Sequence, residues 1–210
     1  NAGNFSNLTT DTSGNLFYVN NPELKKASPT GASVSVVYTF PIDGSHTSFS
    51  TRVLKGTPDG QLYLLASANV SAVATKLLYR SNDQGVSWTL LYSAASSSFN
   101  AGFNQASNGD LYIYHDTKIF RSTDSGSSWS TIYDTNFAGN ITSIVTSNDN
   151  KVFIVINDVI YSLNEDNSTW FKFWDIDIAL SPIIGSEINF LFNCRFSPIG
   201  VCAVVVDYTK

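Results

Sequence analysis

The sequence predicts an all-β protein built from about five copies of one four-stranded antiparallel sheet. Two periodic signals predict this fold. Tryptophans stand at positions 88, 129 and 170, so an interval of 41 residues occurs twice. A Gly or Asn turn that directly precedes a short apolar strand occurs five times. A motif that ends in an aromatic residue and returns about every 40 residues is typical of the blades of a β-propeller.

Each tryptophan ends an eight-residue segment, which we call the box. The box residues are Ser81, Asp83, Gly85 and Trp88 in the first copy, Ser122, Asp124, Gly126 and Trp129 in the second, and Glu165, Asn167 and Trp170 in a degenerate third. Apolar runs flank each copy, so the box is interpreted as a hairpin turn between two strands. The aspartate accepts hydrogen bonds from the turn, the glycine takes a positive φ, and the tryptophan buries apolar area. Asparagine tolerates a left-handed position, so the third turn is expected to form as well.

These segments resemble the Asp-box (BNR) repeat of sialidases, sortilins and related β-propellers, whose pattern is S-x-D-x-G-x-[ST]-W. The resemblance consists of two full matches, at 81–88 and 122–129, and the degenerate one at 163–170. It implies that the boxes lie on the outer rim of a propeller, away from a catalytic or ligand face. Asp83 and Asp124 are therefore expected to be structural. Enzymes, receptors and scaffolds share the motif, so it does not assign a function.

The second signal sets the number of blades. Its turn residues are Gly14, Gly60, Gly109, Asn150 and Gly200. The predicted blades span about 4–40, 48–92, 98–133, 140–174 and 188–210 of a single domain, 1–210. In the first blade, residues 28–31 replace the box. The second blade has about eight extra residues at 68–75, which we expect to form a surface loop.

The fifth blade is expected to be incomplete, because the sequence provides two strands for it before Lys210. An unpaired sheet edge is a hazard that proteins normally cover, and it is also the feature that β-augmentation uses. Two interpretations stay open. The last blade is a two-stranded stub, or a neighbouring molecule completes it.

Composition favours an extracellular protein. Only 14% of the residues are charged and the net charge is −5, which argues against a nucleic acid or an anionic membrane surface as partner. No apolar run approaches the roughly 20 residues of a membrane span. Low charge is typical of secreted β proteins. The chain begins at Asn1 and contains no Met, so we interpret it as a mature product whose leader has been removed.

Two cysteines and five glycosylation triplets fit an extracellular setting. Cys194 and Cys202 flank a predicted turn, and a hairpin would bring them within reach of a disulfide. The alternative is two buried free thiols. The number of N-x-[ST] triplets is close to what composition gives by chance, although all fall at predicted loops or strand ends. They begin at Asn4, Asn7, Asn69, Asn140 and Asn167.

A catalytic set is not apparent in the sequence. Sialidases, which the resemblance brings into question, use three arginines to hold a carboxylate. The arginines are Arg52, Arg80, Arg121 and Arg195. Arg80 and Arg121 each precede a box by one residue, so they are repeat positions and the triad cannot be assembled. His46 and His115 have no partners at metal-ligand spacing. We predict no enzyme, no metal site and no cofactor.

The predicted function is a structural or adhesive extracellular module, such as a subunit of a filament or surface assembly joined by strand sharing. Its partner would be a second copy or another extracellular protein at the open last blade. The alternative is a glycan-binding, lectin-like propeller, and a sialidase-like glycoside hydrolase is less favoured. The aromatic residues available for stacking on sugars follow the periodicity of blade packing: Tyr18, Tyr63, Tyr112, Tyr114 and Trp174.

Overall fold

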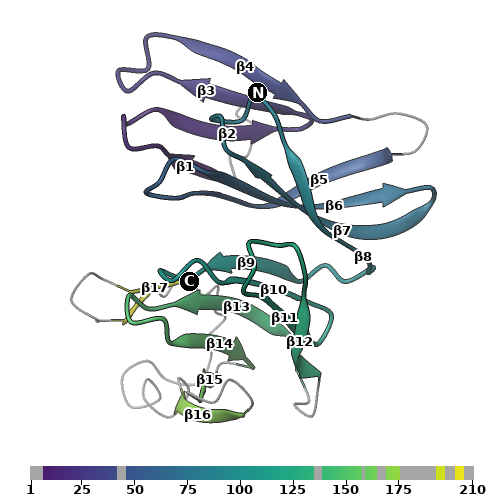
Figure 1. The fold of residues 1–210 in the computed structure, drawn as a ribbon, viewed down its shortest axis with the longest axis vertical. Coiled ribbons are helices and arrows are strands. Elements are labelled where there is room, and N and C mark those ends of the chain that lie inside the picture. The colour runs from purple at the N-terminus through teal and green to yellow at the C-terminus, as the bar shows by residue number, and fades with distance from the viewer. Residues whose placement is uncertain are drawn as a thin grey trace, which may run out of the picture. The chain divides into compact units, whose positions relative to one another are not determined.

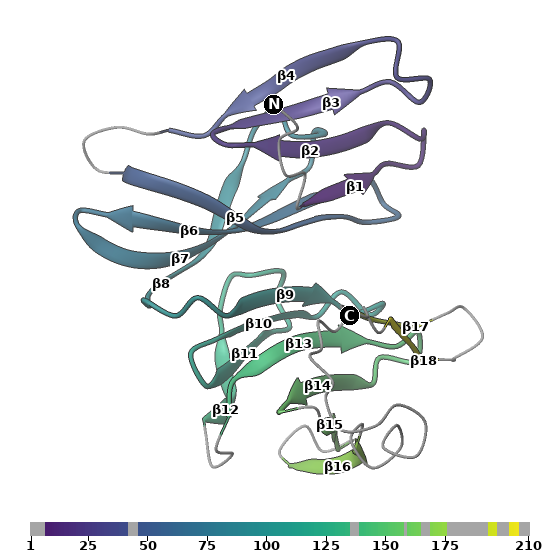
Figure 2. The ribbon, with the colours of Figure 1, turned by 180° about the vertical axis from the view of Figure 1, so that it is seen from behind.

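The computed structural model describes residues 7–41, 46–134, 139–157, 159–164, 169–175, 193–196 and 202–205 (Figures 1 and 2). Regular secondary structure in these ranges is β-strand throughout, which confirms the predicted fold class. The described part holds no helix that is long and apolar enough to cross a membrane. The strands belong to two compact units, Asn1–Ser97 and Ser98–Lys210. The single domain over 1–210 stays a prediction.

The first unit contains two antiparallel sheets of four strands, each with its strands in chain order. Sheet 1 consists of β1 (Leu8–Thr10), β2 (Leu16–Asn20), β3 (Glu23–Ala27) and β4 (Val34–Thr39). Sheet 2 consists of β5 (His46–Gly56), β6 (Leu62–Val70), β7 (Val73–Ser81) and β8 (Thr89–Ala95).

The second unit contains two more such sheets and a hairpin. Sheet 3 consists of β9 (Ala101–Gln105), β10 (Leu111–His115), β11 (Lys118–Ser122) and β12 (Ser130–Asp134). Sheet 4 consists of β13 (Ile141–Thr146), β14 (Val152–Ile156), β15 (Val159–Leu163) and β16 (Trp170–Asp175). The hairpin is formed by β17 (Asn193–Phe196) and β18 (Cys202–Val205). Four four-stranded sheets and one two-stranded sheet in the described residues agree with the predicted blades.

In sheets 1 to 4 the second strand follows a five-residue turn, which contains the Gly or Asn that the sequence predicts there. In Thr57–Gln61, the N–H of Thr57 donates to the carbonyl of Gln61, and that of Gly60 donates to the carbonyl of Thr57. The fourth residue of this turn, Gly60, has a φ of +85°. The residues at the same position of the other three turns, Gly14, Gly109 and Asn150, have φ values of +78°, +90° and +64°. Glycine and asparagine adopt this left-handed conformation most readily, which explains their recurrence there.

The predicted surface loop at 68–75 is wrong. Strands β6 and β7 continue through it and meet in a two-residue turn, Ser71 and Ala72, with φ values of +49° and +66°. Two consecutive positive φ angles match the twist of a tight hairpin. Alternate residues remain on the core face, where Ala66 and Ala68 are buried, so the ladder has a physical reason to continue.

All four sheets have an irregularity at the same place between their third and fourth strands. The register shifts after Leu24, Leu78, Ile119 and Ile160. A β-bulge of this kind adds one residue to one strand of a pair. The extra residues in the fourth strands are Val37, Leu91, Ile132 and Phe173.

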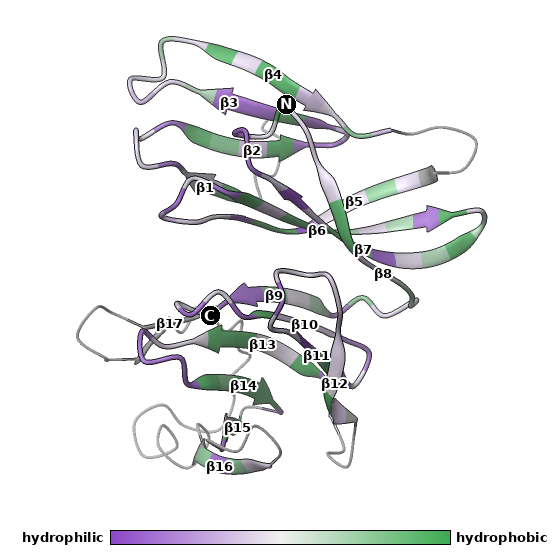
Figure 3. Ribbon diagram, in the orientation of Figure 1, coloured by the Kyte–Doolittle hydropathy of each residue, from purple (hydrophilic) through white to green (hydrophobic). Residues whose placement is uncertain are grey.

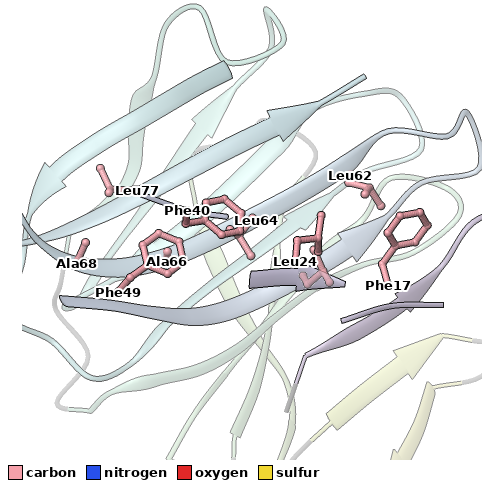
Figure 4. Packing of buried hydrophobic residues seen from close by; sticks show 10 residues of the cluster. Phe17, Leu24, Phe40, Phe49, Leu62, Leu64, Ala66, Ala68 and Leu77 are labelled. Atoms are coloured by element: carbon pink, nitrogen blue, oxygen red, sulfur yellow. The ribbon is translucent and has the colours of Figure 1, made fainter. Parts of the chain in front are cut away.

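The core of the first unit lies between sheets 1 and 2 (Figure 4). Phe17 and Leu24 of sheet 1 pack with Leu62 and Leu64 of sheet 2, and all four are at most 2% exposed. Phe40 joins the two sheets, because its ring stacks on Phe49 at 4.7 Å between centroids. The core is therefore shared between neighbouring sheets.

The second unit repeats this arrangement between sheets 3 and 4. All five residues of β10 and of β14 are buried, and Figure 3 shows the apolar run along β14. A strand covered on both faces reads as a continuous apolar run. The first strands of consecutive sheets lie side by side within each unit: β1 beside β5, β9 beside β13, and β13 beside β17.

Polar side chains fasten these neighbouring first strands to one another. The N–H of Gly56 donates to Oγ1 of Thr9 at 2.8 Å, and Oγ1 of Thr146 donates to the carbonyl of Gln105 at 3.1 Å. From the second strand of sheet 3, the hydroxyl of Tyr114 also donates to the carbonyl of Thr142 on β13, at 2.8 Å. Such bonds fix the register of one sheet against the next.

Candidate functional site

The first box, residues 81–88, is held by hydrogen bonds among its own residues. The hydroxyl of Ser81 donates to Oδ1 of Asp83 (2.8 Å) and accepts from the N–H of Gly85 (2.7 Å). Oδ1 of Asp83 also accepts from the N–H of Ser87 (2.9 Å), and Oδ2 accepts from its hydroxyl (2.6 Å). Both carboxylate oxygens of Asp83 are thus used within the turn.

The second box, residues 122–129, has the same geometry. Asp124 accepts from the hydroxyl of Ser122 (2.8 Å) and from the N–H and hydroxyl of Ser128 (2.9 and 2.6 Å). Gly85 and Gly126 have φ values of +90° and +92°, as the sequence predicts. The residue before each glycine is also left-handed, which the sequence does not signal: Gln84 at +57° and Ser125 at +60°.

The third box is described at its ends. The N–H of Asn164 donates to the carbonyl of Thr169 at 2.9 Å, so a hydrogen bond joins the two described ends of this box. Glu165 and Asn167 lie outside the described residues, so the expectation that Asn167 takes the left-handed position of the glycine stays a prediction.

Hydrogen bonding lowers the pKa values of the two described box aspartates, Asp83 and Asp124. The Ser87 hydroxyl and N–H, followed by the Ser81 hydroxyl, hold the pKa of Asp83 at about 2. The Ser128 hydroxyl and N–H do the same for Asp124, whose pKa is also about 2. A carboxylate that accepts several hydrogen bonds is stabilised in its charged form.

We expect the two box aspartates, Asp83 and Asp124, to make the stability of the folded protein depend on pH. Their folded pKa values lie below the usual value of about 3.9, so their contribution is complete above about pH 4 and is lost as the pH falls towards 2. We expect Asp83→Asn to lower the melting temperature at pH 7 and the gap to wild type to shrink towards pH 2. Circular dichroism melts at pH 7, 4 and 2.5 measure this. An equal gap at all three values would contradict the assignment.

Two of the box tryptophans, Trp88 and Trp170, pack against the sheet that precedes their own. Nε1 of Trp88 donates to the carbonyl of Gly85 at 3.0 Å, and its ring lies 6.4 Å from Tyr38 and 5.5 Å from Phe40 between centroids. Trp170 meets Tyr133 of the preceding sheet edge-on at 5.9 Å. In both cases the tryptophan packs on the fourth strand of the sheet before it, or on the residue that follows that strand.

The arginines are used in structural contacts where the structure describes them. Nε and Nη2 of Arg121 donate to Oδ2 of Asp110 at 3.0 and 2.5 Å, and its guanidinium lies over the ring of Tyr112. Nε of Arg52 donates to the hydroxyl of Ser67 at 3.0 Å. The side chain of Arg195 lies outside the described residues.

The tyrosines considered for sugar stacking are mostly buried. Tyr63, Tyr112 and Tyr114 are 2%, 2% and 5% exposed, which leaves no free ring face for a sugar. Burial raises the pKa of Tyr114 to about 12. Tyr18 is half-buried, and the side chain of Trp174 lies outside the described residues.

The histidines do not belong to a cluster of potential metal ligands in the part of the chain that the structure describes. Nδ1 of His115 lies 2.8 Å from Oδ2 of Asp116, and its ring stacks on Phe120 at 4.8 Å. The side chain of His46 lies outside the described residues. Within the ranges described, no three His, Cys, Asp or Glu side chains are placed to hold a metal ion.

The sequence does not anticipate that Lys76 of sheet 2 is buried and that Lys55 of the same sheet is partly buried. Lys76 is 2% exposed, and its Nζ donates to the carbonyl of Ser96 at 3.2 Å. Burial lowers the pKa of Lys55 to about 8. Lysine on a strand usually faces solvent, so nothing in the local pattern distinguishes these two.

The predicted modification sites are only partly described. Asn69 and Asn140 are exposed, at the end of β6 and just ahead of β13, while Nδ2 of Asn7 donates to the carbonyl of Thr51 at 3.2 Å. The register pairs Cys194 with Val204 and Cys202 with Phe196, so the cysteines lie diagonally on adjacent strands. Glycosylation and the disulfide stay predictions. The remaining triplets, at Asn4 and Asn167, lie outside the described residues.

Solved structures share this architecture at low sequence identity. An extracellular domain assigned to a one-component system of B. thetaiotaomicron has a TM-score of 0.62 and 13% identity, over 93% of this chain and 25% of its own. A protein of unknown function from Bacteroides caccae has a TM-score of 0.60 and 11% identity, over 92% and 67%. Regucalcin, a calcium-binding protein of Agrobacterium tumefaciens, has a TM-score of 0.61 and 10% identity, over 78% and 57%. At these identities the likeness shows the fold alone.

The chain spans a quarter of the length of the first of these structures and about two thirds of the second. No curated protein sequence matches it. A family model, the DUF6242 beta propeller domain, matches residues 57–182, which is more than half of the chain. The chain therefore belongs to the DUF6242 β-propeller domain family.

Proposed function

We propose that this β-propeller is a non-catalytic extracellular module with a structural or adhesive role, and that residues 81–88 and 122–129 are Asp-box turns. One observation carries the proposal: the carboxylates that recur in the two complete boxes are hydrogen-bonded within their own turns. Asp83 and Asp124 accept hydrogen bonds from the serines of the same box. A carboxylate saturated in this way, with a pKa of about 2, is a poor general acid or base near neutral pH.

An extracellular location is supported by the composition and by the extracellular domain to which the chain is similar in fold. The low charge and the exposed triplets at Asn69 and Asn140 are compatible with a secreted glycoprotein. No step of the proposal requires a metal or a cofactor.

Strand sharing is the proposed mode of assembly. The two-stranded sheet β17–β18 follows sheet 4, and β17 lies beside β13 as a first strand does. A hairpin added beside β18 would give this sheet the four strands that sheets 1 to 4 have. Main-chain hydrogen bonds would then supply affinity, and side chains would supply specificity.

Assembly is tested by the mass of the purified protein in solution. Light scattering coupled to size exclusion, from about 1 µM to 100 µM protein, is expected to show species larger than one chain, and electron microscopy shows whether they are filaments. A monomer throughout this range would remove the self-assembly proposal. A glycan array is the parallel test of the lectin alternative, for which the buried tyrosines give no support.

A further inference from the structure

The outer part of sheet 4 carries an aromatic patch, which we define as the exposed Phe171 and Phe173 with the buried Phe153. Phe171 and Phe173 on β16 are 45% and 54% exposed. The ring of Phe173 meets the buried ring of Phe153 edge-on, at 5.2 Å between centroids. Large aromatic side chains exposed together on an outermost strand mark a surface for a partner.

The equivalent positions in sheets 1 and 3 are covered. Phe173 is the extra residue of β16, as Val37 is of β4 and Ile132 is of β12. Val37 and Ile132 are only partly exposed, and both pack into the core that their sheet shares with the next. Phe173 occupies the same place in the repeat without that cover.

The cover in the first unit is the box of the following sheet. A Cβ atom on Gly85 would lie 3.6 Å from Cγ1 of Val37 and 2.4 Å from Cδ2 of Leu24. Trp88, at the end of the same box, packs against Tyr38, the residue after Val37. The glycine turn and its tryptophan therefore close over the bulge of sheet 1.

The second unit shows the same relation between sheets 3 and 4. Ile132 and Tyr133 pack into one cluster with Trp170, and the rings of Tyr133 and Trp170 lie 5.9 Å apart. In both units the tryptophan of the next box thus packs beside the bulge, and in the first unit the glycine turn also lies against it. The described part of the sheet after sheet 4 consists of its first two strands, β17 and β18.

The chemistry of the patch selects an uncharged occupant. Phe153, Ser162 and Phe171 are aligned directly across β14, β15 and β16. At the position of Ser162 the other three sheets have a cation, and at the position of Phe171 they have a hydroxyl residue. These residues are Lys26, Arg80 and Arg121, and Ser35, Thr89 and Ser130. In sheet 1 the cation reaches the next box, because Lys26 donates to Gln84 at 2.7 Å.

We propose that the aromatic patch is the docking surface for a β-hairpin of a second polypeptide, one that carries a glycine turn followed by tryptophan and few charges. The hairpin takes the place that residues 81–92 take on sheet 1, with its turn over Phe173. This inference rests on the proposed assembly by strand sharing and names the surface and the chemistry of the partner. The outer strands of the donor would complete the sheet that β17 and β18 begin.

A cyclised peptide with the sequence of residues 77–92 serves as the probe. Calorimetric titration of the whole chain with this peptide is expected to show binding, and Phe173→Asp is expected to weaken it about tenfold or more, because a charge would be buried under the turn. Phe99→Asp is the matched control, since Phe99 is 83% exposed and lies outside the patch. It should leave binding unchanged.

The peptide variant with Ala in place of Trp88 is expected to bind weakly, because a tryptophan side chain buries a large apolar area. Failure of the wild-type chain to bind the peptide, or equal binding by Phe173→Asp, overturns the proposal. Light scattering on Phe173→Asp distinguishes a failure of the proposed docking surface from a failure of the proposed assembly by strand sharing. If assembly persists unchanged in that variant, strand sharing stands and this surface is wrong. If the wild-type chain is a monomer that binds the peptide, the surface stands and self-assembly is wrong.

Discussion

Replacing Phe40 with alanine is expected to destabilise the protein by about 3–5 kcal/mol, the usual cost of emptying a buried phenylalanine site. Phe40 is 2% exposed. Its ring stacks on Phe49 at 4.7 Å and lies 5.5 Å from Trp88 and 6.2 Å from Tyr79. Residues from sheet 2 thus surround a side chain that directly follows β4, so the cavity would open between two sheets. Urea unfolding followed by tryptophan fluorescence measures the loss.

The control for this variant is Phe99→Ala. Phe99 is 83% exposed, and truncating a surface side chain usually changes stability by less than about 0.5 kcal/mol. Similar unfolding midpoints for the two variants would show that Phe40 does not hold the sheets together. A Phe40→Leu variant should recover part of the loss, because it refills part of the volume.

The second large effect is expected for Gly85→Ala. Gly85 has a φ of +90°, and a Cβ there would lie 2.4 Å from Cδ2 of the buried Leu24. Left-handed strain of about 1–2 kcal/mol and overpacking of about 1–3 kcal/mol add to a loss of roughly 2–5 kcal/mol. The chemical denaturation midpoint should fall accordingly, while circular dichroism at 25 °C remains that of a β protein.

Gly109→Ala separates the two contributions. Its φ is also +90°, and a Cβ there would have no atom within 4 Å, so only the strain of about 1–2 kcal/mol applies. Equal losses at the two glycines would show that Leu24 moves aside at little cost and that the box does not close tightly on sheet 1.

Local chemistry explains what the sequence could predict. The boxes and the five-residue turns close through hydrogen bonds between residues at most four positions apart. Their geometry is therefore encoded in adjacent residues, and the fixed interval between copies reveals the sheets. The same locality made the insert at 68–75 look like a loop, because small residues such as Ala68 and Ala72 resemble a loop until the core on one face is seen.

Contacts between sheets explain what the sequence could not predict. The covering of Val37 by Gly85 depends on which residues face each other across two sheets, and sequence spacing does not contain that information. The burial of Lys76 is of the same kind. Phe173 could have been singled out only by aligning the sheets on their bulges, because its sequence neighbourhood looks like that of any aromatic strand.

The bulge residue in the fourth strand of each four-stranded sheet also affects how readily the protein can aggregate into fibrils. Amyloid-like growth needs a flat, unbroken row of main-chain donors and acceptors on which identical segments can stack. A bulge interrupts such a row and twists the margin of the sheet, and every four-stranded sheet described carries one. The ladder between β17 and β18 pairs four residues on each side without a shift. We therefore expect fibril nucleation, when it occurs in concentrated or heated samples, to begin at residues 193–205.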